Sequence, residues 1–180
     1  MKTITAPENY CPKEHDICVF LAGGITNCHN WQDKLINKLN TLVSEEDQLV
    51  VFNPRRENFP IGDPKAGPLQ IAWEYKMLEK ADIFSMYFCG GESDQPICMY
   101  ELGRNILRMQ MRFPSTWDDR IIISVENDYR RKADVTIQTK LATHNGFPIN
   151  IDNNIDRLID VHAHVIYNEA RYLSLSNNFK

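Results

Sequence analysis

Two glutamates, Glu74 and Glu101, are the residues of this sequence whose type and spacing best suggest a reaction. Glu101 stands in Y-E-L-G-R (100–104), beyond an apolar run at 82–88 and a glycine-bearing loop, and Glu74 stands shortly before that run. Two carboxylates that face one cleft suit glycosyl chemistry, because one can attack an anomeric carbon while the other, as an acid, protonates the leaving group. The pair is therefore our first hypothesis for a reactive site.

Other reactive side chains fit a catalytic or metal site less well. Cys98 lies close to Glu101, but no histidine is near it in sequence to act as its base. His162 and His164 are two residues apart on a predicted helix, so they point apart rather than toward one ion. The cysteines, at 11, 18, 28, 89 and 98, form no C-x-x-C pair and are odd in number, which argues against a disulfide framework or a zinc knuckle. We therefore expect neither a metal site nor a cofactor.

Strands alternating with helices are expected to position the two glutamates. Short apolar runs predict buried strands over 16–22, 49–52, 82–88, 120–125 and 147–151. Apolar residues at helical spacing predict helices over 31–43, 69–80, 97–112, 133–143 and 153–173. This alternation predicts a three-layer α/β sandwich with a mostly parallel, roughly five-stranded sheet, in a single domain spanning 1–180. Residues 1–15 are expected to be an irregular lead-in and 174–180 a frayed tail.

Two of these helices matter most for the hypothesis. Pro96 suits the first turn of helix 97–112, and Ser93 or Asp94 can cap it. The unpaired N–H groups at this helix start would then favour an ionised Glu101. For helix 69–80, the expected buried side consists of Ile71, Ala72, Tyr75, Met77 and Leu78.

In a parallel α/β sheet, strand ends and the starts of the following helices share one edge, where such folds bind their ligands. The residues that this rule gathers there are Gly23, Gly24, Asn53 to Arg56, Trp73, Glu74, Asp94, Glu101 and Glu126. The two glycines allow either close approach of a ligand or a tight turn. Asp82 begins its strand, so it belongs to the opposite edge and is interpreted as structural.

Four ordered motifs carry a resemblance to a known family. V-F-L-A-G-G-I (19–25), N-P-R-R (53–56), W-E (73–74) and Y-E-L-G-R (100–104) resemble the nucleoside 2-deoxyribosyltransferase-like superfamily, in particular its shorter branch. Y-E-L-G-R is also similar to the motif of the 2′-deoxynucleoside 5′-monophosphate N-hydrolases. The resemblance covers about 16–125. It implies a flavodoxin-like fold and cleavage of an N-glycosidic bond through a covalent glycosyl-enzyme intermediate, without a metal or redox cofactor.

The resemblance also assigns roles to individual residues. Glu101 matches the family nucleophile, and Glu74 matches the acid on the preceding helix, which is an aspartate in well-known members. Asp94 is the nearest match to a sugar-contacting aspartate, but it stands in D-Q-P rather than in D-x-G. Phe20 stands where family members place a tyrosine, so alignment of the nucleophile must differ here.

The remaining candidate binding residues each have two interpretations. Arg55 and Arg56 could clamp a phosphate bidentately and so select a nucleotide over a nucleoside, or they could be rim charges. Trp73 and Tyr100 could stack on a base or pack in the core. Asp94 could contact the sugar or cap a helix.

The resemblance leaves several functions and partners open. Transfer to a second base, hydrolysis of a nucleoside 5′-monophosphate, cleavage of NAD, and non-catalytic nucleotide binding all fit the same residues. Family members complete their sites across subunits, which implies a homodimer or larger homo-oligomer, with the last helix or 129–132 as contributors.

Composition limits the partners and the compartment. The chain has 180 residues, 43% of them hydrophobic, and a net charge of −4 with acidic and basic residues interspersed. The sequence lacks the excess of basic residues that is typical of a nucleic-acid-binding groove. The first residues are polar, and no apolar run is long enough to span a bilayer. We therefore expect a soluble, cytoplasmic protein that binds a small-molecule nucleoside or nucleotide, with neither a nucleic-acid polymer nor a membrane as partner.

Overall fold

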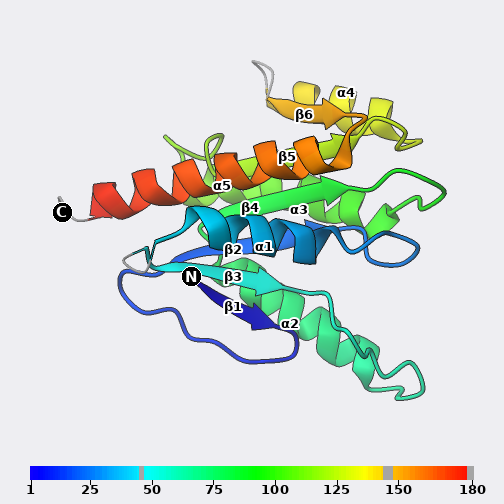
Figure 1. Ribbon diagram of the computed structural model, residues 1–180, viewed down its shortest axis with the longest axis horizontal. Helices are drawn as coiled ribbons and strands as arrows, with labels where there is room; N and C mark the ends of the chain where they lie inside the picture. Colours follow the sequence, from blue (N-terminus) through cyan, green and yellow to red (C-terminus); the bar gives the residue numbers. More distant parts are fainter. Residues whose placement is uncertain (45–46, 144–147, 178–180) are drawn as a thin grey trace.

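A six-stranded parallel sheet between two layers of helices forms the molecule (Figure 1). The computed structural model describes residues 1–44, 47–143 and 148–177. Its strands are β1 (Lys2–Thr5), β2 (Ile17–Gly23), β3 (Leu49–Asn53), β4 (Ile83–Phe88), β5 (Ile121–Glu126) and β6 (Ile149–Asp152). Its helices are α1 (Trp31–Leu42), α2 (Ala66–Lys80), α3 (Pro96–Arg112), α4 (Lys132–Ala142) and α5 (Ile155–Asn177). The predicted α/β architecture is confirmed.

The strand order is β1-β3-β2-β4-β5-β6, and every neighbouring pair is parallel. Without β1, this is the flavodoxin-like order. After β2 the chain enters β3 on one side, whereas β4 pairs with the other side of β2. This reversal opens a crevice beyond the carboxyl ends of β2 and β4, where folds of this kind bind ligands.

The strand β1 is one place where the prediction was wrong. Residues 1–15 were expected to be irregular, but Lys2–Thr5 pairs in parallel with β3, from Lys2 beside Val50 to Thr5 beside Asn53. Only Ile4 of this strand is fully buried. A four-residue edge strand with one buried side chain is too short to give an apolar pattern.

Two other boundaries also differ from expectation. Helix α5 continues to Asn177, so 174–177 is helical rather than frayed. Helix α2 begins at Ala66 rather than Leu69, because Pro68 fits within a first helical turn. Residues 178–180 and Phe147, the first residue of the predicted last strand, lie outside the described part.

Helices α1 and α5 cover one face of the sheet, and α2, α3 and α4 cover the other (Figure 1). Strands β2 to β5 are buried at nearly every position because both of their faces are covered. Within the described ranges, no helix combines the length and the apolar content that crossing a bilayer would require.

Gly23, at the end of β2, is required by close packing. Its φ is +152°, and a Cβ atom there would lie 2.3 Å from the Tyr87 carbonyl oxygen and 2.7 Å from the Trp31 ring. We expect Gly23→Ala to lower the free energy of unfolding by about 3 kcal/mol, since the backbone of β4 cannot yield easily. Urea denaturation measures this loss. Gly67→Ala is the control, because nothing lies within 4 Å of its Cβ position; equal destabilisation of both variants would contradict the prediction.

A buried histidine makes folding sensitive to acid. His162 of α5 is fully buried between Ser85, whose Oγ lies 2.7 Å from Nε2, and Ser124, whose Oγ lies 2.6 Å from Nδ1. Burial lowers the pKa of His162 to about 3, from 6.5. Below about pH 6.5, His162 therefore binds a proton in the unfolded chain but stays neutral in the folded chain. The free energy of unfolding consequently falls as the pH falls.

We expect His162 to remove about 2 kcal/mol of stability between pH 7 and pH 5. Burial raises the pKa of Glu101 and of Glu169 to about 7, and both groups act in the opposite direction over this range. Urea denaturation of the wild type and of His162→Gln separates the effects, because the glutamates are common to both. Identical pH dependence in the two proteins would rule the prediction out.

Candidate active site

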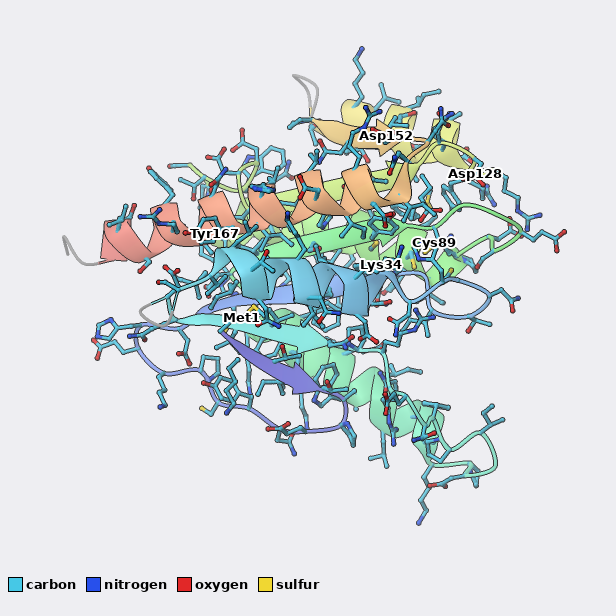
Figure 2. All side chains as sticks on the ribbon, viewed as in Figure 1. Met1, Lys34, Cys89, Asp128, Asp152 and Tyr167 are labelled. Atoms are coloured by element: carbon cyan, nitrogen blue, oxygen red, sulfur yellow. The ribbon has the colours of Figure 1, made fainter. Side chains whose placement is uncertain are left out.

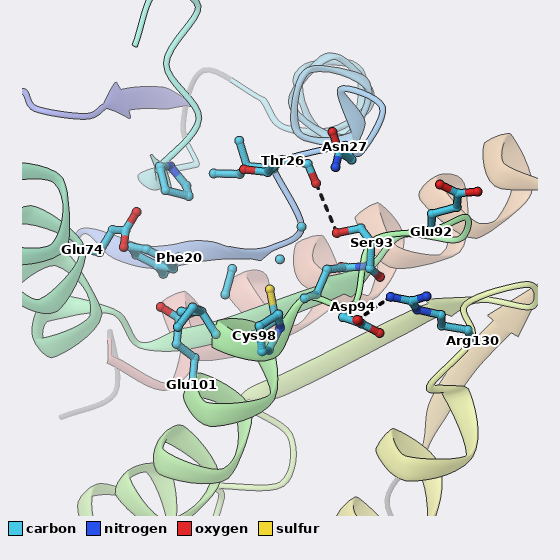
Figure 3. A pocket seen from close by; sticks show the side chains of 18 residues that line it. Phe20, Thr26, Asn27, Glu74, Glu92, Ser93, Asp94, Cys98, Glu101 and Arg130 are labelled. Atoms are coloured by element: carbon cyan, nitrogen blue, oxygen red, sulfur yellow. Dashed lines mark hydrogen bonds and ion pairs between the residues drawn. The ribbon is translucent and has the colours of Figure 1, made fainter. Parts of the chain in front are cut away.

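A cavity of about 430 Å³ lies at the crevice between the carboxyl ends of β2 and β4 (Figure 3). Its walls are the end of β2 with the loop that follows, the loop before α3, and side chains from α2 and α3. Pro54, after β3, and Arg130, after β5, complete the lining. The strand reversal at β2 explains its position, because the chains leaving β2 and β4 diverge there.

Glu74 of α2 and Glu101 of α3 both line this cavity. Figure 3 shows them side by side at one end of it, with Phe20 of β2 nearby. Gln70, one turn earlier on α2, donates a hydrogen bond from Nε2 to Glu74 Oε1 at 2.9 Å. The two acids therefore face a common space from adjacent helices.

Burial controls the protonation of the two glutamates. Burial, and next the charge of Glu74, raise the pKa of Glu101 to about 7 against the opposing charge of Arg104. Burial also raises the pKa of Glu74, although the hydrogen bond from Gln70 opposes the rise. The expectation that the helix start keeps Glu101 ionised was wrong, because Glu101 lies in the second turn, where that effect has faded. Near neutral pH the pair can therefore retain a proton.

A surface ion pair does not account for Glu101. Arg104, one turn further along α3, instead approaches Glu79 of α2, with 3.7 Å between Nη2 and Oε1. Its guanidinium also lies over the Tyr75 ring, 4.8 Å from the centroid. Glu101 is thus left facing the cavity.

Three more predicted residues line the cavity. Gly23 and Gly24 form its wall at the end of β2, and a Cβ atom at Gly24 would lie 2.4 Å from Cys28 Sγ. Asp94 lies at the opposite end from the glutamates and forms an ion pair with Arg130 (Figure 3). Neither Ser93 nor Asp94 caps α3, so that prediction was wrong: the cap residue is Gln95, in the left-handed conformation with a φ of 47°.

The N-P-R-R residues do not reach the cavity through their charged groups. Asn53 is buried, and its Oδ1 accepts a hydrogen bond from the Arg55 backbone N–H. The Arg55 guanidinium donates to three carbonyls of the segment after β2, those of Ile25, Cys28 and His29, and to Oε1 of Gln32 in α1. Arg55 therefore braces this segment instead of presenting a free fork to a phosphate. Arg56 lies over the Phe59 ring, 5.3 Å from its centroid, and is not part of the cavity wall.

The two predicted stacking residues also lie away from the cavity. Trp73 is 3% exposed, packs against Phe20 with 6.2 Å between ring centroids, and donates from Nε1 to the Glu8 carbonyl. Tyr100 is 67% exposed and outside the cavity wall. The expected buried side of α2 was wrong at Ile71, Ala72 and Tyr75, which are exposed. Apolar residues occur on every side of this helix, so its rotation could not be deduced from their spacing.

Sequence reasoning missed several cavity residues on loops. Thr26 and Asn27 follow β2, and Ser93 precedes α3. Ser93 Oγ donates to the Thr26 carbonyl at 3.1 Å, which joins the two loops (Figure 3). Arg130 comes from the loop after β5, which the sheet-edge rule places on the same edge; it had been considered only as part of a subunit contact.

Comparison with known proteins agrees with this geometry. A family model described as "Nucleoside 2-deoxyribosyltransferase like" matches residues 16–113, which is more than half of the chain. A search of curated protein sequences gave no match. The matched segment runs from β2 through α3 and so includes the strand reversal and both cavity glutamates. The chain therefore belongs to the nucleoside 2-deoxyribosyltransferase-like family.

Proposed function

We propose that this protein cleaves the N-glycosidic bond of a deoxyribonucleoside or its 5′-monophosphate through a covalent glycosyl-enzyme intermediate. The observation that carries the proposal is the pair Glu74 and Glu101, which line one cavity at the strand reversal and have raised pKa values. An isolated carboxyl loses its proton well below neutral pH, whereas this pair can hold one where the reaction would run.

The reaction assigns one task to each acid. The Glu101 carboxylate forms a bond to C1′ as the bond from C1′ to the base nitrogen breaks, and Glu74 gives its proton to the departing base. A second base, or water, then attacks C1′, releases Glu101 and returns a proton to Glu74. Positive charge that develops at C1′ in the transition state stabilises the ionised form of Glu101, so the reactive form of the pair is the one in which Glu74 holds the shared proton.

Arg130 supports the inclusion of a nucleotide among the substrates. Among the described residues that line the cavity, it is the cationic one, and its present partner is the exposed Asp94. A 5′-phosphate at that end of the cavity could pair with Arg130, while the sugar lay toward Glu101. Arg55 is engaged by the segment after β2 and is not needed for this role.

Product analysis tests the proposed function. The protein is incubated with deoxyribonucleosides, ribonucleosides, their 5′-monophosphates and NAD, with and without a second free base, and the products are separated by chromatography. Base release without an acceptor identifies a hydrolase, and exchange that requires an acceptor identifies a transferase. Tight binding without turnover of any substrate would overturn the proposal in favour of a nucleotide-binding protein.

We also propose a homodimer formed through the outer faces of α2 and α3. Large apolar side chains are exposed on this pair of helices, namely Leu69, Ile71, Tyr75, Ile97, Tyr100, Leu107 and Met111. An apolar surface of this kind is typical of subunit contacts. It lies on the same two helices that carry the cavity glutamates.

Light scattering after size-exclusion chromatography should give a dimer mass for the wild type. Leu107→Lys should shift the protein toward the monomer, because it places a charge within the apolar contact. Leu141→Lys, on exposed α4, is the matched control and should remain dimeric. A monomeric wild type, or equal shifts in both variants, would refute this arrangement.

A further inference from the structure

A second group of reactive side chains lies behind the cavity wall, at the carboxyl ends of β4 and β5. A ring nitrogen of His29, the Cys89 Sγ and a Glu126 carboxylate oxygen all lie within 4.8 Å of one another. The Cys28 thiol lies beside that of Cys89 and donates a hydrogen bond to the Thr26 carbonyl at 3.5 Å. We call these four residues the edge cluster. Figure 2 shows Cys89 at this edge of the sheet.

We propose that the edge cluster binds a thiophilic divalent cation, Zn²⁺ being the ion that fits its donors best. His29, Cys89 and Glu126 already bring an imidazole, a thiolate and a carboxylate together, and the neighbouring Cys28 thiolate would complete a tetrahedral set of four donors for zinc. Sulfur donors disfavour Mg²⁺ and Ca²⁺, which prefer oxygen. His29 already contacts Glu126 directly, so an ion would bind by replacing that contact.

Each donor is held by contacts outside the cluster, as in metal sites that are rigid before the ion binds. Glu126 accepts hydrogen bonds from Tyr87 Oη at 2.9 Å and from the Gly90 backbone N–H at 2.8 Å. The Gln95 amide fixes Cys89 by accepting from its backbone N–H at 3.2 Å and donating to its carbonyl at 2.8 Å.

Arg55 holds the other two donors and supplies charge. Its guanidinium donates to the carbonyls of Cys28 and His29, at 2.8 and 2.7 Å. Binding of Zn²⁺ displaces one proton from each thiol, and these protons pass to the solvent. The resulting site carries a formal charge of −1, which the adjacent guanidinium offsets.

The proposed ion would be structural. The edge-cluster residues are absent from the cavity wall, whereas Gly24 and Gln95, which contact Cys28 and Cys89, belong to it. The ion would tie the segment after β2 to the ends of β4 and β5 and so stabilise the wall opposite the glutamates. It takes no part in the glycosyl chemistry proposed above.

Titration with Co²⁺ tests the site in protein that has been reduced and treated with a chelator. We expect thiolate-to-cobalt absorption that saturates at one ion per chain and disappears when Zn²⁺ is added. Zn²⁺ should also raise the midpoint of thermal unfolding, because it binds the folded state. Tyr87→Phe, which removes a hydrogen bond to Glu126, should weaken binding about 10–100-fold.

Ligand variants decide whether these residues hold the ion. Cys28→Ser, Cys89→Ser and His29→Gln should each weaken binding by more than Tyr87→Phe, whereas Cys11→Ser should have no effect because Cys11 is exposed and outside the cluster. If Cys89→Ser fails to fold, Cys28→Ser and His29→Gln still provide the test, since both positions are only partly buried. The proposal is overturned if reduced wild type binds neither ion or if the variants bind as tightly as wild type.

Discussion

Replacement of Glu101 by alanine should lower kcat for base release or exchange by about 10⁴-fold or more, because no covalent intermediate can then form. Glu101→Gln should lose a similar amount, since an amide of the same shape is a poor nucleophile. The loss should appear in kcat with every substrate that the wild type accepts. Mass spectrometry of protein quenched during turnover should detect the glycosyl adduct in the wild type only.

Stability separates this chemical loss from misfolding. Burial disfavours the charge of Glu101, so Glu101→Gln should raise the midpoint of thermal unfolding at pH 8 while it removes activity. Glu14→Gln is the matched control, because Glu14 is exposed and lies outside the cavity. Retention of more than about a tenth of wild-type kcat in Glu101→Ala would exclude a nucleophilic role.

Replacement of Glu74 by glutamine should lower kcat by about 10²–10⁴-fold, the usual contribution of a general acid. The loss should depend on the leaving group. A nucleoside whose base is already cationic through N-methylation departs without a proton, so wild type and Glu74→Gln should release that base at similar rates. Chromatographic rates with the methylated and ordinary nucleosides provide the measurement.

The same pair of substrates distinguishes the two acids. Glu101→Ala should be inactive with both nucleosides, because a cationic leaving group does not replace a nucleophile. Equal losses for Glu74→Gln with both would instead mean that Glu74 positions the substrate without transferring a proton.

The hydrogen bond from Gln70 opposes the rise in the pKa of Glu74. Gln70→Leu should therefore raise that pKa further and shift the alkaline limb of the pH–rate profile to higher pH.

The layers and most elements of this fold could be predicted because the signals are local. Buried parallel strands appear as continuous apolar runs, and sheet-covering helices appear as apolar residues at helical spacing. β1 could not be predicted because only Ile4 of this strand is fully buried. Its place in the sheet depends on β3, which lies far away in sequence.

The site was predictable to the level of elements, but not of every side chain. The chains that leave β2 and β4 diverge at the carboxyl edge of the sheet, and Glu74, midway along α2, and Glu101, in the second turn of α3, both line the cavity there. Trp73 and Glu74 are adjacent on a helix and therefore point in different directions, so one packs in the core and the other lines the cavity. Arg55 turns toward backbone carbonyls of a distant segment, which no local pattern encodes.

The edge cluster was even harder to predict from the sequence than the cavity residues. Its residues come from positions 28, 89 and 126 as well as 29, so they have none of the close spacing that marks a zinc knuckle. Parallel pairing of β4 with β5 brings the later positions together, and the segment after β2 folds over them.

The hydrogen bond from Ser93 to the Thr26 carbonyl bears on how the cavity could admit bulky molecules. A contact of this kind contributes only about 1 kcal/mol, so the two loops could part by thermal motion while the sheet and helices stay fixed. Purines and pyrimidines differ in width by one ring, and an entrance between two loops that can separate would admit both. The range of bases accepted would then depend on the two loops, whereas the position of C1′ would depend on the helices that carry the glutamates.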